Sequence, residues 1–176
     1  PAARALWPRP RSLERLPDWL LQTPVQVEAP AELRAPAAML RRELATLFGP
    51  ESVAAPGRTT VALRLDPATL TKPEEYAVET ADGTVTLTAH DVQGAFWAAH
   101  TFLQLLEADG VIRTPDGWRV PGVKLRDWPE SPFRAFMIQG AWTGDAGAFR
   151  RNLELLARMK VRYVALEFGP QVVLDF

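Results

Sequence analysis

The chain has 176 residues, of which 47% are hydrophobic and 23% charged, a balance typical of a soluble globular protein with one domain or one domain and part of another. The net charge of −1 argues against a nucleic-acid partner, and no apolar run approaches the ~20 residues that a membrane span needs. Cysteine is absent and only two histidines are present, in no metal-binding spacing, so we expect neither a metal nor a cofactor. The sequence does not decide between a cytoplasmic protein and one secreted after removal of an N-terminal segment.

Prolines crowd the first 24 residues and favour an extended lead-in over a long helix. Further along, alternating apolar and polar residues predict strands, and an apolar stripe that ends at Gly49-Pro50 predicts a helix. Asp82-Gly83, which lies between two alternating runs, predicts the turn of a β-hairpin. The expected elements are strands at 25–29 and 59–65, a helix at 36–50 and a hairpin at 74–90.

The segment DVQGAFWAAHTFLQLL, residues 91–106, predicts the second helix, with Asp91 as its N-cap and its end near Gly110. His100 and Gln104 share one face of this helix. A general base would need an orienting partner and a cleft, so a hydrogen bond from His100 to a neighbouring loop or to a following domain is the favoured interpretation. Gly94 is expected to let the start of the helix approach a neighbouring strand closely.

Residues 117–129 predict short strands broken by Pro121, which completes an α+β domain over residues 1–130. We expect an antiparallel-rich sheet with two helices on one face. The pattern then changes: 133–142 and 161–169 are nearly continuous apolar runs, typical of strands buried on both faces, and 145–160 is an amphipathic helix. Strand, helix and strand with short connections predict a parallel βαβ unit, so residues 131–176 form a second, incomplete domain.

The hairpin and the helix after it carry a family pattern, D-x-x-G-x-[F/Y]-x-[G/A]-x-[Q/H]-T-L-x-Q-L. It is matched by Asp91, Gly94, Phe96, Ala98, His100, Thr101, Phe102, Gln104 and Leu105. The proline-rich start LWPRPRSLERLP and the segment VPGVKLRDWPESPFR follow the same family order. On these residues the chain resembles the N-terminal domain of glycoside hydrolase family 20, the β-N-acetylhexosaminidases, and the linker into its barrel. The same domain precedes the barrels of families 84 and 67, so the resemblance identifies a group of glycosidases better than a substrate.

The resemblance implies a non-catalytic domain followed by the first βαβ unit of a truncated (β/α)8 barrel. The parent protein would cleave β-N-acetylhexosaminides or related glycosides. The family's acid/base glutamate and its neighbouring aspartate lie on a later strand, so we expect no catalytic residue in this chain. The chain alone is then expected to be inactive, with its carbohydrate substrate held by the missing barrel, and to self-associate through the unfinished barrel. A non-catalytic module that binds carbohydrate or protein is the open alternative.

The start of the barrel departs from the family pattern R-G-x-M-x-D-x-S-R. Aligned on Arg134, Gln139 replaces the aspartate and Trp142 stands where the family has its sugar-binding arginine, while Glu167 falls at a histidine position of the next strand. Barrel enzymes place their sites at the C-terminal ends of strands, so Gln139, Trp142 and Glu167 are the candidate substrate-binding residues. Trp142 could stack on a sugar ring or simply pack, and Glu167 could bind sugar hydroxyls or act as a carboxylate. A retaining glycosidase needs a second carboxylate or a substrate acetamido group beside it.

Overall fold

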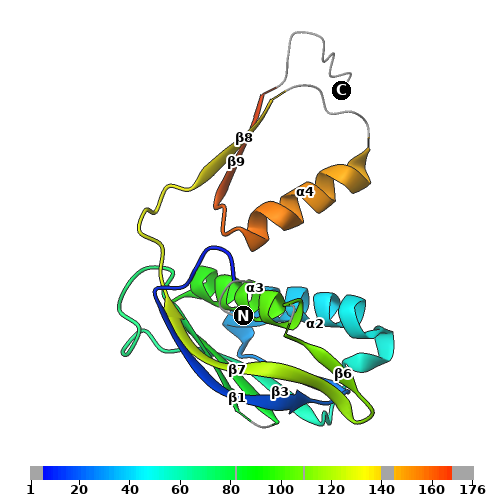
Figure 1. Ribbon diagram of the computed structural model, residues 1–176. Helices are drawn as coiled ribbons and strands as arrows, with labels where there is room; N and C mark the ends of the chain where they lie inside the picture. Colours follow the sequence, from blue (N-terminus) through cyan, green and yellow to red (C-terminus); the bar gives the residue numbers. More distant parts are fainter. Residues whose placement is uncertain (1–5, 82, 109, 140–144, 168–176) are drawn as a thin grey trace. The chain divides into compact units, whose positions relative to one another are not determined.

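The structure, a computed structural model, describes residues 6–81, 83–108, 110–139 and 145–167. The chain divides into two compact units, Pro1–Pro129 and Glu130–Phe176. Figure 1 shows their elements. The first unit contains β1 (Ser12–Leu21), β2 (Val25–Glu28), α2 (Arg34–Phe48), β3 (Thr59–Leu65), β4 (Tyr76–Ala81), β5 (Thr84–Ala89), α3 (Val92–Leu106), β6 (Ile112–Thr114) and β7 (Gly117–Asp127), with 3-10 turns at Ala31–Leu33 and Pro50–Ser52; the second contains β8 (Ala135–Gln139), α4 (Ala146–Arg158) and β9 (Tyr163–Glu167).

The first unit is one sheet in the order β1-β7-β4-β5-β3-β2, with β6 added beside β7. The pairs β1–β7, β7–β4, β4–β5 and β6–β7 are antiparallel, as expected for an antiparallel-rich sheet. The hairpin predicted around Asp82-Gly83 is confirmed as β4 and β5. The pairs β2–β3 and β3–β5 are parallel. For β2 and β3 the parallel pairing follows from α2, which connects them across the sheet.

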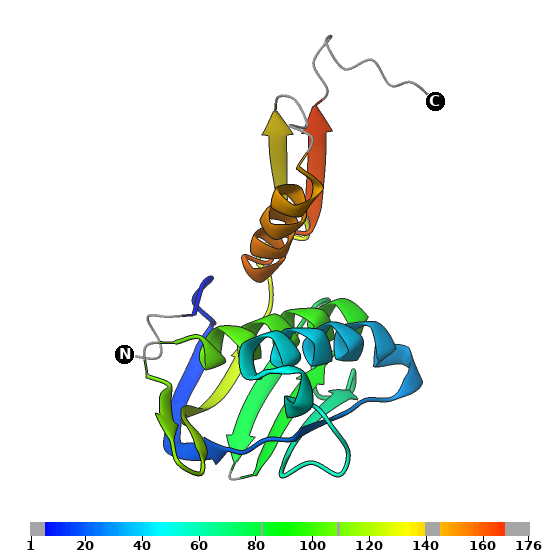
Figure 2. The ribbon, with the colours of Figure 1, turned by 90° about the vertical axis from the view of Figure 1, so that its right-hand side faces the viewer.

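Both helices of the first unit lie on the same face of the sheet (Figure 2), which confirms the predicted α+β layers. α3 packs on the central strands and on α2, and α2 also contacts β2. Nearly the whole of α3 is buried: Trp97 is 2% exposed and Phe102 0%, whereas Phe96 is only partly buried. A helix that is apolar all round lies inside its domain, and α3 is the centre of this one.

The prediction that Pro121 breaks the last strands is wrong. β7 runs unbroken through Pro121 and pairs with β1, a strand that formed only part of the extended lead-in expected from the sequence. The register between them shifts between Leu16 and Trp19, opposite Pro121, so proline's missing N–H falls at a bulge rather than in a regular ladder. Gly122 is required beside it, because a side chain there would collide with the Pro17 carbonyl.

The second unit is a strand–helix–strand unit whose strands are parallel, as the sequence predicts. Asp145 caps α4 by accepting hydrogen bonds from the N–H groups of Gly147 and Ala148, at 2.9 and 3.0 Å. The expected burial of both strand faces is not met within the described residues, since Phe136 is 49% and Met137 57% exposed. In the part of the chain that the structure describes, no helix has the length and apolar character to cross a membrane.

Candidate functional site

The C-terminal edge of the β8–β9 pair holds two of the three candidate substrate-binding residues. Gln139 and Glu167 are register partners at the ends of the two strands, and Glu167 is exposed. Trp142 lies outside the described residues, so its stacking on a sugar stays a prediction. Within the described ranges, no group of three histidine or acidic residues could hold a metal ion. Among the described residues, the ends of the two strands therefore offer one exposed carboxylate, that of Glu167, and the cleavage of a glycosidic bond usually needs a second group.

Both histidines lie in the first unit, and neither faces an open site. His100 is 4% exposed, and its ring meets Phe96 edge-on with centroids 4.5 Å apart. A side chain this buried does not meet substrate from solvent, which favours the structural interpretation over general-base chemistry. His90 is half-buried: its ring Nδ1 lies 2.6 Å from the Leu70 carbonyl, and its backbone N–H donates to Glu75 O.

The start of α3 is fastened to the loop before β4. Asp91 accepts the Gly94 N–H at 2.7 Å, which confirms it as the N-cap, and its other oxygen accepts the Glu74 N–H at 2.9 Å. Trp97 donates its indole N–H to the buried Glu74 carboxylate at 2.8 Å. A Cβ at Gly94 would lie 2.6 Å from Glu75 O, so the glycine permits the close approach that its place in the motif predicted.

The middle of α3 is joined to β4 and β7 by a buried polar triangle. The Tyr76 hydroxyl donates to Asp127 Oδ2 at 2.9 Å and lies 2.9 Å from Thr101 Oγ1, which therefore donates to it. Burial, together with the negative charge of Asp127, raises the pKa of Tyr76 well above its usual value. The threonine of the helix motif and the aspartate of the linker motif thus share one hydrogen-bonded partner.

Gln104 holds the N-terminal lead-in against α3. Its side-chain carbonyl accepts the Trp7 N–H at 3.1 Å, and its amide donates to the Trp7 carbonyl at 2.7 Å. This two-way bond satisfies both backbone groups of one residue in an extended segment, and Leu6 beside it is buried. Gln104 therefore fixes the lead-in segment against α3 through two hydrogen bonds.

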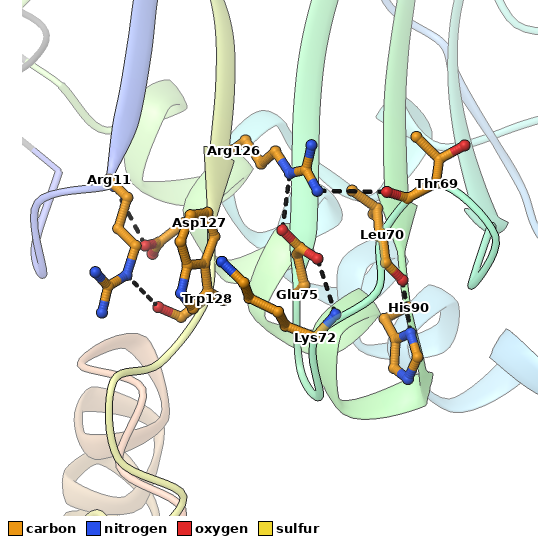
Figure 3. A network of polar contacts seen from close by, with 9 residues as sticks. All are labelled: Arg11, Thr69, Leu70, Lys72, Glu75, His90, Arg126, Asp127 and Trp128. Atoms are coloured by element: carbon orange, nitrogen blue, oxygen red, sulfur yellow. Dashed lines mark hydrogen bonds and ion pairs between the residues drawn. The ribbon is translucent and has the colours of Figure 1, made fainter.

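Glu75 is the centre of a second network, drawn in Figure 3. Its side chain is 0% exposed and accepts from Arg126 Nε at 2.7 Å and from the Lys72 N–H at 3.0 Å. Burial by itself raises the pKa of the Glu75 carboxyl, but the hydrogen bonds from Arg126 and Lys72 outweigh it and hold the pKa below its usual value. The same pairing raises the pKa of Arg126. A carboxylate engaged in this way stabilises structure and is not available as an acid or base.

The sequence-based interpretation did not identify Glu74, Glu75 and Tyr76 as organising residues. The only signal is two adjacent acidic residues directly before an alternating strand, a pattern more often found at a solvated strand end. Asp127 did carry a signal, as the aspartate of the linker motif. Its role became visible only when the fold brought it beside Tyr76, which lies 51 residues earlier in the chain.

Comparison with known families gives one match that covers most of the chain. Residues 3–128 match the profile described as glycosyl hydrolase family 20, domain 2. No curated protein matches the sequence.

Solved structures share the fold at low sequence identity. A family 20 β-N-acetylglucosaminidase is similar over 92% of this chain, with a TM-score of 0.71 and 23% identity. A Vibrio harveyi exo-β-N-acetylglucosaminidase in complex with N-acetylglucosamine is similar over 94%, with a TM-score of 0.74 and 18% identity, and a mutant Streptomyces plicatus β-hexosaminidase in complex with its product over 95%, at 0.74 and 23%. The chain spans only 30%, 25% and 34% of these three proteins.

Proposed function

The chain belongs to glycosyl hydrolase family 20, and on that premise we propose that it is the N-terminal portion of a glycoside hydrolase that cleaves β-N-acetylhexosaminides. The observation that carries the proposal is the family match over residues 3–128, on a fold shared with enzymes that are named for this substrate class. Residues 1–130 serve as a non-catalytic domain. The interior of that domain is closely packed, and Asp91, Thr101 and Gln104 of the helix motif each bond to another segment of the domain.

Residues 131–176 supply the first strand–helix–strand of a catalytic (β/α)8 barrel. The parallel pairing of β8 and β9 across α4 supports this, because a barrel of this type repeats that unit. The similarity to solved structures covers 92–95% of the chain, so it extends past Pro129 into the second unit. The chain spans 25–34% of the length of those proteins, so most of their length remains for the other strands and helices of a barrel.

The reaction takes place at the edge where the barrel strands end. Gln139 and Glu167 lie at that edge on neighbouring strands, and Trp142 follows the first of them in sequence. We assign these residues to contacts with the sugar, and the acid/base pair to strands beyond Phe176. Family 20 enzymes use the acetamido group of the substrate in place of a carboxylate nucleophile, so one protein carboxylic acid and a supporting carboxylate suffice.

Apolar surface in the second unit fits a place inside a larger barrel. Five large side chains from its three elements are at least 41% exposed: Phe136, Met137, Leu155, Tyr163 and Leu166. Further strands and helices of the same protein would cover them. Without that cover, the 176-residue chain is expected to bind a hydrophobic dye and to self-associate, and both signals should weaken in a longer protein that includes the remaining barrel.

The test uses a longer protein that carries this chain and the sequence after Phe176. We expect hydrolysis of an aryl N-acetyl-β-glucosaminide, and at least a thousandfold lower kcat/KM for the matching aryl β-glucoside, because a hydroxyl cannot replace the acetamido nucleophile. Equal rates on the two substrates would contradict the assisted mechanism. Binding of N-acetylglucosamine oligomers without any hydrolysis would favour the alternative, a non-catalytic carbohydrate-binding module.

A further inference from the structure

The chain leaves the first unit through a cluster of charged and aromatic side chains that the proposed function does not use. The exit cluster, as we call it, consists of Arg11, Lys72, Glu75, Arg126 and Trp128 (Figure 3). Its members come from three separate segments: the lead-in before β1, the loop between β3 and β4, and the end of β7. All of them belong to the first unit, whose last residue is Pro129.

Trp128, the residue before that boundary, is held by two cations. Lys72 Nζ lies 3.3 Å and the Arg11 guanidinium carbon 4.9 Å from the ring centroid, and Figure 3 shows the two side chains on either side of the ring. Both distances are within the ~6 Å at which a cation is attracted to the face of an aromatic ring. The backbone is held as well, because Arg11 Nε donates to the Trp128 carbonyl at 3.0 Å.

The two residues before Trp128 are anchored as well. Arg126 is bound to the fully buried Glu75 carboxylate, and its Nη2 also donates to Thr69 O at 3.3 Å. Asp127 accepts the Arg11 N–H at 3.3 Å and the Tyr76 hydroxyl at 2.9 Å. Three consecutive residues are thus bonded to three different segments of the first unit.

The loop that supplies Lys72 is itself fixed. His90 bonds the Leu70 carbonyl, and the Lys72 N–H donates to Glu75. Lys72 therefore approaches the ring from an anchored backbone. This arrangement is more than a stable sheet edge requires, because β7 is already paired with β4 up to Asp127. The additional contacts hold the residue that follows the strand.

We propose that the exit cluster is a clamp that fixes the position and direction of the chain at Trp128, so that freedom of movement between the two units is confined to the residues after it. Arg11 and Lys72 hold the ring, and Glu75 holds the strand behind it through Arg126. The clamp lies within the first unit and acts whether or not the second unit belongs to a catalytic barrel. Its failure in a test would therefore leave the proposed function standing.

The first experiment measures the spread of distances between spin labels placed on the two units of the whole chain. The chain has no cysteine, so Arg42→Cys on α2 and Arg150→Cys on α4, both exposed, give two unique attachment sites. Labelled chain is diluted with unlabelled chain, so that only distances within one molecule are recorded. Trp128→Ala is expected to widen the distance distribution at least twofold, and Lys72→Gln, a surface change, to widen it by a smaller amount.

Trp118→Ala is the matched control, since it removes a partly buried tryptophan at the start of β7, at the opposite end of that strand from the exit cluster. It should leave the width unchanged. The second experiment is local: trypsin should cleave after Arg126 several-fold faster in Trp128→Ala than in Trp118→Ala, as followed by mass spectrometry. Widths and cleavage rates that match the parent chain in a folded Trp128→Ala variant would overturn the proposal, as would a parent distribution already as wide as that of the variant.

Discussion

Replacing Tyr76 by phenylalanine tests whether the buried polar triangle holds the first unit together. The hydroxyl is lost while the ring keeps its shape, so no cavity is created. Two hydrogen bonds disappear, one to Asp127 and one from Thr101, both 2.9 Å long. Asp127 is only 7% exposed, so water does not readily replace the lost donor.

The expected loss follows from these contacts. A hydrogen bond to a charged group contributes about 1.5–3 kcal/mol and a neutral one about 1 kcal/mol. We therefore expect Tyr76→Phe to lower the free energy of unfolding by about 2–4 kcal/mol. With a urea dependence of about 2 kcal/mol per molar, the midpoint of unfolding should fall by roughly 1–2 M.

The assay is urea unfolding followed by tryptophan fluorescence, which reports on the first unit because five of the six tryptophans lie in it. Tyr163→Phe is the matched control: it changes the other tyrosine of the chain, which is 47% exposed, and should shift the midpoint within error. A raised folded pKa also means that stability falls as pH rises above 10.0, and the variant should lose this dependence. A midpoint for Tyr76→Phe within 0.3 M of the parent, on the order of 0.6 kcal/mol, would refute the reasoning.

Three further changes test other contacts. Gly94→Ala should destabilise the first unit by about 1–3 kcal/mol, although alanine normally favours a helix, because its Cβ would collide with the Glu75 carbonyl. Gln93→Ala, on the same turn, is the control and should cost under about 0.5 kcal/mol. A Gly94→Ala variant more stable than the parent would contradict this geometry. Because the pKa of Glu75 is lowered, the ionised Glu75 carboxylate stabilises the folded state fully above pH 4.5, and this stabilisation is lost as pH falls through the pKa of the folded state. The difference in urea midpoint between the parent and Glu75→Gln should therefore shrink below pH 4.5. A difference that stays constant with pH would argue against the ion pair. Asp145→Ala should reduce the helical circular dichroism of α4, at a cost of about 1 kcal/mol, and Asp145→Asn should retain most of it.

The parts of the fold that sequence predicts here depend on local patterns. The N-cap role of Asp91 is one example, because its side chain bonds the N–H of Gly94, only three residues further along the chain. The alternation around Asp82-Gly83 specifies the hairpin, and the apolar runs after Pro129 specify a parallel unit, because each signal involves neighbours in the chain.

The parts that sequence does not predict depend on distant partners. Local sequence predicts that Pro121 breaks a strand. In the structure β1, more than 100 residues earlier in the chain, has a bulge opposite Pro121 that accommodates it. Glu75 has no local reason to be buried, and its partner Arg126 lies 51 residues away. At the candidate site the sequence predicted that Gln139 and Glu167 lie at the ends of neighbouring strands. One carboxylate at this edge is not enough to identify the reaction. Catalytic geometry in a barrel depends on several strands, and a single parallel pair does not define it.

The most direct test of the account compares the 176-residue chain with a longer protein that contains the whole barrel, each given the same aryl N-acetyl-β-glucosaminide. In the proposed function the first unit has structural roles and catalysis belongs to strands beyond Phe176. We therefore expect turnover by the longer protein and none above the buffer blank by the purified chain. Hydrolysis by the chain alone, in proportion to its concentration and at a comparable rate per molecule, would contradict it.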